Sequence, residues 1–286
     1  MRVPDEVRDT VVFVGSEGQR DGQPAIIWRG TAFVVAIPSS RADFNFEYFV
    51  TARHVVAPLQ GQRYFIRANR VDDGSVVTRG DGRETWWFHP TDSSADVAVL
   101  PIGINRNVYK LTAIPIQMFL KDPPGEGQSH IGVGDDVFIT GLFAHLSGDE
   151  RNHPIVRTGN VALMPSCKVE TAKFGKMDAY LIEARSIGGI SGSPVFVRET
   201  KMFAPRTPFF AFGKIHLIGL MHGHWDLPPS AKNDVVGDDI MKSVNMGIAI
   251  VVPAHKIIET LEQPELVEQR KELEAHRAAK MAQTPD

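Results

Sequence analysis

The chain has 286 residues, of which 43% are hydrophobic and 23% charged, and its formal net charge is −3. This composition is typical of one large or two small globular domains, and the net charge gives no indication of a nucleic-acid or anionic-membrane partner. Cys167 is the only cysteine, which favours a reducing compartment, although a disulfide-free secreted protein would look the same. The N-terminus lacks the apolar core of a signal peptide, and no apolar run reaches membrane-spanning length. We therefore expect a cytoplasmic protein without a membrane partner.

The first 112 residues consist of short β-prone runs separated by turn residues. We expect the segment 16–24 to be a turn-rich connection, and Asp73-Gly74 and Asp81-Gly82 mark further turns. The expected strands cover residues 10–15, 25–28, 30–37, 46–51, 64–66, 76–78, 85–88 and 96–102. Closely spaced short strands of this kind predict an antiparallel barrel or sandwich.

Residues 113–130 separate this series from a second one. They contain Pro115, Pro123 and Pro124, which interrupt helix and sheet, so we expect a connection between two halves. The second series of expected strands covers residues 136–141, 159–164, 179–183, 195–197, 215–221 and 246–252.

The composition changes after Pro253, where Glu, Lys, Arg, Leu and Ala predict two helices. The first, over 254–262, gathers Ile257, Ile258 and Leu261 on one side and is expected to pack on the strands. The second, over 264–281, has a sparse apolar line that favours a solvated tail over a partner-binding helix. A regulatory protein bound through this C-terminal helix stays the alternative.

A serine between glycines, Gly189-Ile190-Ser191-Gly192, begins another strand. Glycines allow a tight turn whose successive N–H groups point at one spot, where an anion or a developing negative charge can bind. A serine beside such a spot has what acyl transfer requires, although the same sequence also fits an ordinary turn.

Two other stretches supply partners for this serine. His54 follows the apolar run 48–51, and Asp96 precedes the run 97–100. A serine hydroxyl needs an adjacent base, histidine has an ordinary pKa near neutrality, and a buried carboxylate selects the required imidazole tautomer. Each residue alone could merely end a strand or cap a turn, but the three together indicate catalysis.

The stretches around His54, Asp96 and Ser191, in this order, resemble the signatures of the chymotrypsin-like (trypsin-fold) serine peptidases over roughly residues 10–262. They are most similar to the bacterial intracellular and high-temperature-requirement branch, here without a PDZ domain. The resemblance implies an all-β fold of two antiparallel six-stranded β-barrels with C-terminal helices. The implied parts are a first barrel (1–112) with His54 and Asp96, a connection (113–130), a second barrel (131–253) with Ser191, and a helical extension (254–286).

The same resemblance implies a serine endopeptidase that cleaves protein or peptide substrates through an acyl-enzyme, with no cofactor and no metal. The backbone N–H groups of Gly189 and Ser191 are expected to form the oxyanion hole. The strand at Met221, His222 and Gly223 matches the family's substrate-pairing edge. Two rival functions stay open: an inactive peptide-binding module, and an esterase or acyltransferase on the same triad.

Specificity and site details are expected to depart from the family. Arg185 occupies the position that forms the bottom of the primary specificity pocket in the family. It would favour an acidic residue before the scissile bond, unless it points to solvent. Ile190 and Ser193 replace an aspartate and a glycine of the family pattern. His222 stands where many members have serine, so we expect different hydrogen bonding behind Asp96. The His222-Gly223-His224 pattern is expected to hold no metal, because nothing near it in the sequence completes a site.

Overall fold

The structure is a computed structural model that describes residues 3–41, 44–72, 74–80, 84–120, 131–143, 148, 150–171, 173–184, 189–199, 214–226 and 245–282. The strands are β1 Val11–Arg20, β2 Gln23–Pro38, β3 Asn45–Thr51, β4 Tyr64–Asn69, β5 Ser75–Arg79, β6 Trp87–Phe88, β7 Ala98–Ile102, β8 Ile114–Pro115, β9 Asp136–Gly141, β10 Ile155–Leu163, β11 Lys168–Thr171, β12 Gly175–Asp178, β13 Tyr180–Glu183, β14 Pro194–Arg198, β15 Ile215–Asp226 and β16 Asn245–Pro253. The helices are α1 Arg53–Val56, α3 Ala254–Leu261 and α4 Pro264–Ala282, with 3₁₀ turns η1 Asp5–Thr10, η2 Ala57–Leu59 and η3 Ile116–Met118.

The first half is an eight-stranded sheet in the order β5-β4-β1-β2-β3-β7-β6, with β8 joined to β2. All its ladders are antiparallel except β2–β8. The expected six-stranded barrel is therefore only approximated here. In the described part of this half no ladder joins β5 to β6, and a hollow of about 330 Å³ lined by Tyr64, Leu100 and Tyr109 lies within it.

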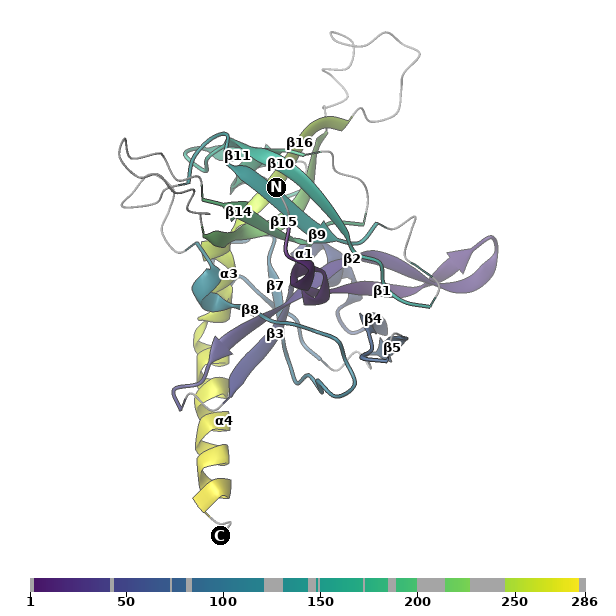
Figure 1. The fold of residues 1–286 in the computed structure, drawn as a ribbon, viewed down its shortest axis with the longest axis vertical. Coiled ribbons are helices and arrows are strands. Elements are labelled where there is room, and N and C mark those ends of the chain that lie inside the picture. Colours follow the sequence, from purple (N-terminus) through teal and green to yellow (C-terminus); the bar gives the residue numbers. More distant parts are fainter. Residues whose placement is uncertain are drawn as a thin grey trace, which may run out of the picture.

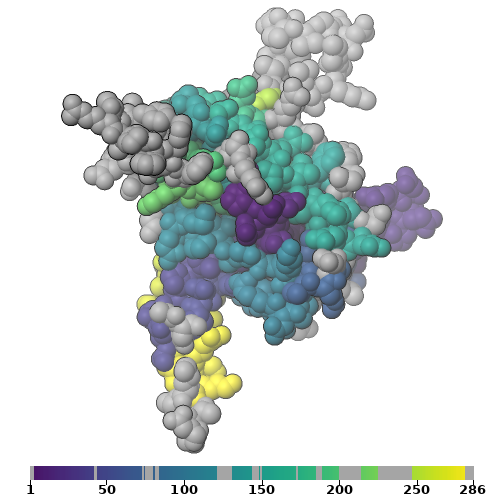
Figure 2. Space-filling model, viewed as in Figure 1, coloured from purple at the N-terminus to yellow at the C-terminus, as the bar shows by residue number. Residues whose placement is uncertain are grey.

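The hairpin of β1 and β2 extends well beyond the core of this half, and its end stands clear of the body (Figures 1 and 2). Strand pairing runs to Arg20↔Gln23, and Asp21 and Gly22 form the turn with φ of +52° and +77°. Positive φ at both central residues is typical of a type I′ hairpin turn. The expected turn-rich segment 16–24 is thus mostly strand.

The second half closes into a six-stranded barrel in the order β10-β13-β16-β15-β14-β9, as expected. Its strands β9 and β14 are buried on both faces, and alternate residues take opposite sides. Val137, Ile139, Val195 and Val197 belong to the inner core. Their neighbours Phe138 and Phe196 stack at 4.9 Å and join the larger core shared with the first half and α3. Apolar contact therefore joins the two halves.

The C-terminal helices differ from the expected arrangement in how far they pack. On α3, Ile257 and Leu261 are fully buried, as expected. On α4, however, Leu266 is also fully buried, and the buried Arg270 donates to the Leu261 carbonyl at 2.8 Å and the Tyr48 hydroxyl at 3.2 Å. The first turns of α4 are thus structural, while its end projects past the sheets (Figure 1).

Further contacts hold α4 to the first half. Ser40, just after β2, donates from its N–H and hydroxyl to Glu274 at 2.7 and 2.8 Å. The Arg277 guanidinium lies over the Phe44 ring at 4.0 Å. None of the described helices is both long and apolar enough to span a membrane.

Leu266→Ala should lower the free energy of unfolding by about 2–5 kcal/mol, because it leaves a cavity between α4 and the core. Leu273→Ala on the same helix is the matched control: Leu273 is 53% exposed, so we expect a change within about 0.5 kcal/mol. Urea unfolding of both variants measures the difference. Equal stability of the two would contradict the packed arrangement of α4.

Candidate active site

Two neighbouring strands of the first sheet bring His54 and Asp96 together. β3 pairs with β7 through Thr51↔Ala98, so the chain leaving β3 and the chain entering β7 lie side by side. His54 stands in α1, directly after β3, and Asp96 stands two residues before β7. Residues 42 positions apart in sequence therefore meet at one end of the sheet.

The Asp96 carboxylate is completely buried and accepts three hydrogen bonds. Its Oδ1 accepts the backbone N–H of His54 at 2.8 Å, and its Oδ2 lies 2.6 Å from Nδ1 of both His54 and His222. Burial alone would raise the pKa of Asp96, but the hydrogen bonds from His222 and His54 hold this pKa well below its usual range. Because an ionised carboxylate only accepts, both imidazoles carry a proton on Nδ1.

The turn that carries Ser191 is held by both halves of the molecule. Thr31 of β2 donates its N–H to the Ser191 carbonyl at 2.9 Å and its hydroxyl to the Gly189 carbonyl at 3.1 Å. From the other side, Gly192 donates to the Met221 carbonyl of β15 at 2.7 Å. Gly192 has φ of +84°, and a Cβ there would lie 2.2 Å from the Thr31 carbonyl oxygen. Only glycine fits this position.

The backbone N–H groups of Gly189 and Ser191 are the ones predicted to form the oxyanion hole. Gly189 has φ of +101°, a conformation that favours glycine. Within the described part of the chain, neither N–H makes a hydrogen bond.

The Ser191 hydroxyl donates to the backbone carbonyl of His222 at 3.2 Å. Among the described residues it makes no hydrogen bond to His54. The serine thus lies beside the imidazole–carboxylate pair but is turned toward β15. Catalytic hydrogen bonds are often long or misaligned without substrate, so this orientation does not remove Ser191 from the site.

His222 lies on β15, and its side chain turns to Asp96, with Nδ1 2.6 Å from Oδ2. The His222 ring meets the rings of His54 and Phe174 edge-on, at 5.4 and 5.6 Å between centroids. Phe174 comes from the turn of the β11–β12 hairpin and was not predicted from the sequence.

Met221 and Gly223, the other two residues of the predicted substrate-pairing edge, differ in their surroundings. The Met221 side chain is fully buried in the barrel core. At Gly223, nothing lies within 4 Å of an added Cβ. Among the described ladders, β14 pairs with β15 only up to Leu220, and β15 continues beside β16 to Asp226. Arg185 lies outside the described residues.

The two positions beside Ser191 that differ from the resembled family's pattern, Ile190 and Ser193, are both buried. Ile190 is 2% exposed and belongs to the barrel core. Ser193 is fully buried, and a Cβ on Gly141 would lie 1.9 Å from its hydroxyl oxygen. Glycine at 141 thus leaves the space that the Ser193 side chain fills.

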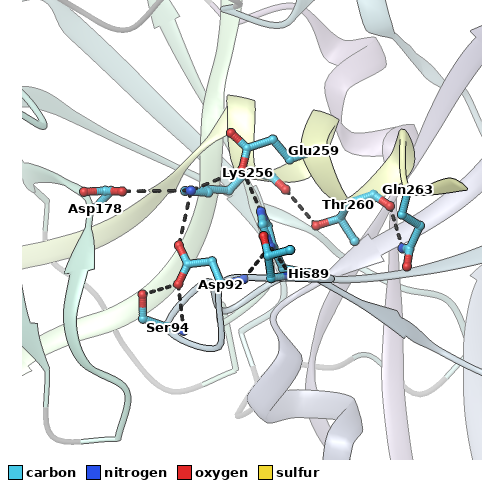
Figure 3. A network of polar contacts seen from close by, with 9 residues as sticks. His89, Asp92, Ser94, Asp178, Lys256, Glu259, Thr260 and Gln263 are labelled. Atoms are coloured by element: carbon cyan, nitrogen blue, oxygen red, sulfur yellow. Dashed lines mark hydrogen bonds and ion pairs between the residues drawn. The ribbon is translucent and has the colours of Figure 1, made fainter.

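A polar network joins α3 to the loop that contains Asp96 (Figure 3). Lys256 Nζ lies 3.2 Å from the Asp92 carboxylate and 3.1 Å from the Glu259 carboxylate. His89 accepts the Asp92 N–H on Nδ1 at 3.0 Å, so its Nε2 carries the proton donated to Glu259 at 2.6 Å. The network also reaches β12, because Lys256 lies 4.0 Å from Asp178.

This network predicts a dependence of stability on acid pH. Burial would raise the pKa of Asp92, but hydrogen bonds from Ser94 and Lys256 lower it from 3.8 to about 2. A carboxyl whose pKa is lower in the folded state stabilises the fold above its unfolded pKa, and this stabilisation is lost as the pH falls toward 2.

Lys256→Met should therefore lower the free energy of unfolding at pH 6 by about 1–3 kcal/mol, because it removes hydrogen bonds between charged groups. It should also move acid unfolding to higher pH. Circular dichroism over an acid titration measures both changes. Lys271→Met is the control, since Lys271 is 65% exposed and pairs only with Glu268 among the described residues. Identical acid transitions in the two variants would contradict the role of Lys256.

A pocket lies beside His54. A hollow of about 540 Å³ borders His54 and is also lined by Arg29, Arg63, Glu17 and Leu59. Two of these charges are paired, with Arg63 3.0 Å from Glu17. The site is thus open beside the imidazole, while the Asp96 carboxylate is closed off beneath it.

The first half is a partly closed sheet that carries a buried Asp–His pair, and the second is a barrel that carries a glycine-flanked serine. Together they form the trypsin-like serine-protease fold. Comparison with solved structures supports this class. The apo protease domain of MamO from Magnetospirillum magneticum superposes with a TM-score of 0.53 at 15% identity, covering 91% of this chain and 99% of that one. The HtrA-type protease AlgW with a decapeptide gives 0.51 at 14% identity, covering 92% of this chain and 66% of that one. No protein-family model and no curated protein matches the sequence.

Proposed function

We propose that the protein is a serine endopeptidase in which Ser191 is the nucleophile, His54 the base and Asp96 the residue that orients it. The observation that carries this proposal is the buried Asp96 carboxylate 2.6 Å from His54 Nδ1. It leaves the lone pair of His54 on Nε2, the nitrogen that a neighbouring serine must reach.

The reaction would begin with rotation of the Ser191 hydroxyl from the His222 carbonyl to His54 Nε2. As Oγ attacks the substrate carbonyl carbon, its proton passes to Nε2, and the negative charge on the carbonyl oxygen meets the N–H groups of Gly189 and Ser191. His54 then returns the proton to the leaving amine, which breaks the C–N bond and leaves an acyl-enzyme. A water molecule, deprotonated by His54, releases the acid and restores the serine.

An extended peptide would fit along β15 beyond Leu220, where its described ladder with β14 ends. A substrate can add to this edge by backbone hydrogen bonds. The hollow bordering His54 offers room for further substrate residues. The preference for an acidic residue that Arg185 suggests stays a prediction.

The inactive peptide-binding module is the second candidate, and the bond from the Ser191 hydroxyl to the His222 carbonyl favours it. In that case the same edge would hold peptides without cleaving them. The two functions differ in whether Ser191 can leave this bond for His54.

Incubating the protein with a bacterial proteome and mapping new peptide N-termini tests the proposal. We expect new termini with the unsubstituted protein and none with Ser191→Ala. Peptide capture without new termini would support the binding module. Hydrolysis of a small nitrophenyl ester without new termini would support the esterase or acyltransferase.

A further inference from the structure

The side chains of His54, Asp96 and His222 bring three metal-ligating atoms together, all within 4.8 Å of one another. We propose that they form a binding site for a divalent transition-metal ion such as Zn²⁺, and that the bound ion prevents His54 from acting as a base. The binding rests on this geometry alone, whereas the inhibition rests on the proposed hydrolase function. The His222-Gly223-His224 pattern was expected to hold no metal, and the proposed site instead joins His222 to His54 and Asp96.

The donor set suits the ion. Two imidazole nitrogens and one carboxylate oxygen are common Zn²⁺ ligands, with bonds of about 2.0–2.2 Å that place tetrahedral ligands roughly 3.4 Å apart. Both Nδ1 atoms now lie 2.6 Å from Asp96 Oδ2, so each Nδ1 must move away from Oδ2 by somewhat less than 1 Å to admit an ion. Three protein ligands leave a fourth position open, as in sites that exchange ligands with solvent.

An ion can reach these atoms from the cleft. The His54 and His222 side chains are 18% and 10% exposed, whereas Asp96 is fully buried. The imidazoles therefore separate the carboxylate from solvent, and the ion would enter by displacing them slightly. The His54 N–H bond to Oδ1 would keep the carboxylate oriented while Oδ2 binds the ion.

Metal binding and catalysis need opposite tautomers of His54. In the structure, Nδ1 carries the proton and Nε2 the lone pair that would accept the Ser191 proton. An ion on Nδ1 takes the lone pair there, so the proton of the neutral ring must move to Nε2. No proton is lost in this exchange, but Nε2–H can no longer accept one. The same change on His222 frees its Nδ1 for the ion.

Calorimetric titration with ZnCl₂ tests the binding in a Ser191→Ala, Cys167→Ser background, in which the exposed Cys167 thiol cannot bind the ion. We expect one ion per chain. His222→Asn should weaken binding by more than about 10-fold, because even residues behind metal ligands change affinity roughly 10- to 100-fold. His224→Asn, two residues along the same strand, should bind as the background does. No saturable binding, or loss in His224→Asn with binding intact in His222→Asn, would overturn the site.

A second measurement needs no histidine variant, so it tests the site even where His222→Asn fails to fold. Nitrogen-15 NMR of the background protein should show Zn²⁺ moving the Nδ1 signals of His54 and His222, with the proton then on Nε2. Unchanged Nδ1 signals at saturating Zn²⁺ would overturn the site. In the Cys167→Ser protein, Zn²⁺ should reduce peptide hydrolysis and EDTA should restore it. Full hydrolysis with the ion bound would overturn the inhibition but not the binding.

Discussion

Ser191→Ala should abolish peptide hydrolysis while changing the free energy of unfolding by less than about 1 kcal/mol. The variant removes one hydroxyl, whose single hydrogen bond to the His222 carbonyl is only partly buried. His54→Ala should be comparably inactive, and the double variant no worse than either, because members of a catalytic unit do not contribute additively; each loss should be on the order of 10⁴- to 10⁶-fold in kcat. Ser166→Ala, at an exposed serine, is the control and should keep full activity.

Additive losses in the double variant would show that Ser191 and His54 act independently. Near-normal hydrolysis by Ser191→Ala would place the nucleophile elsewhere. Steady-state kinetics on one peptide measures these losses. Urea unfolding of each variant shows whether a loss of activity comes from unfolding instead.

Asp96→Asn should lower kcat by about 10⁴-fold, because an amide no longer holds a proton on His54 Nδ1. It should also destabilise the fold. Oδ1 and Oδ2 of Asp96 both accept hydrogen bonds, and the amide replaces one of these acceptors with a donor. At least one buried donor then lacks a partner, which costs about 1–3 kcal/mol.

Asp136→Asn, at an exposed aspartate of β9, is the matched control and should change neither quantity. The rate of Asp96→Asn should be compared at equal fractions of folded protein. Unchanged kcat in folded Asp96→Asn would contradict the orienting role of the carboxylate. Unchanged stability would contradict the three hydrogen bonds.

The sequence predicted the fold class and brought attention to His54, Asp96 and Ser191 because each follows a local rule. Histidine at a strand end, aspartate at a strand start and serine between glycines are patterns that each span only a few residues. Most strands of the second half were predictable for the same reason, since they are short apolar runs, whereas their closure into a barrel was implied by the family resemblance. These predictions needed no knowledge of which strands pair.

Other features depend on contacts that local patterns do not encode. Residues 16–20 form a strand although Glu17 and Arg20 are exposed, because pairing with β2 stabilises the hairpin without a buried face. Leu266 and Arg270 lie on a polar helix. Leu266 is buried in the larger core, and Arg270 bonds to Tyr48 of β3 and Leu261 of α3. The direction of the His222 side chain depends on Asp96, which is 126 residues away. The oxyanion hole, the triad's activity and the role of Arg185 stay predictions.

The central claim is that His54 activates Ser191. Labelling with a fluorophosphonate, followed by peptide mass spectrometry, tests it most directly, because only an activated serine reacts rapidly with this probe. We predict a single adduct on Ser191 that is absent in His54→Ala, because the serine needs the imidazole as its base. No adduct on Ser191 at pH 8, or labelling as fast in His54→Ala as in the unsubstituted protein, would contradict the account.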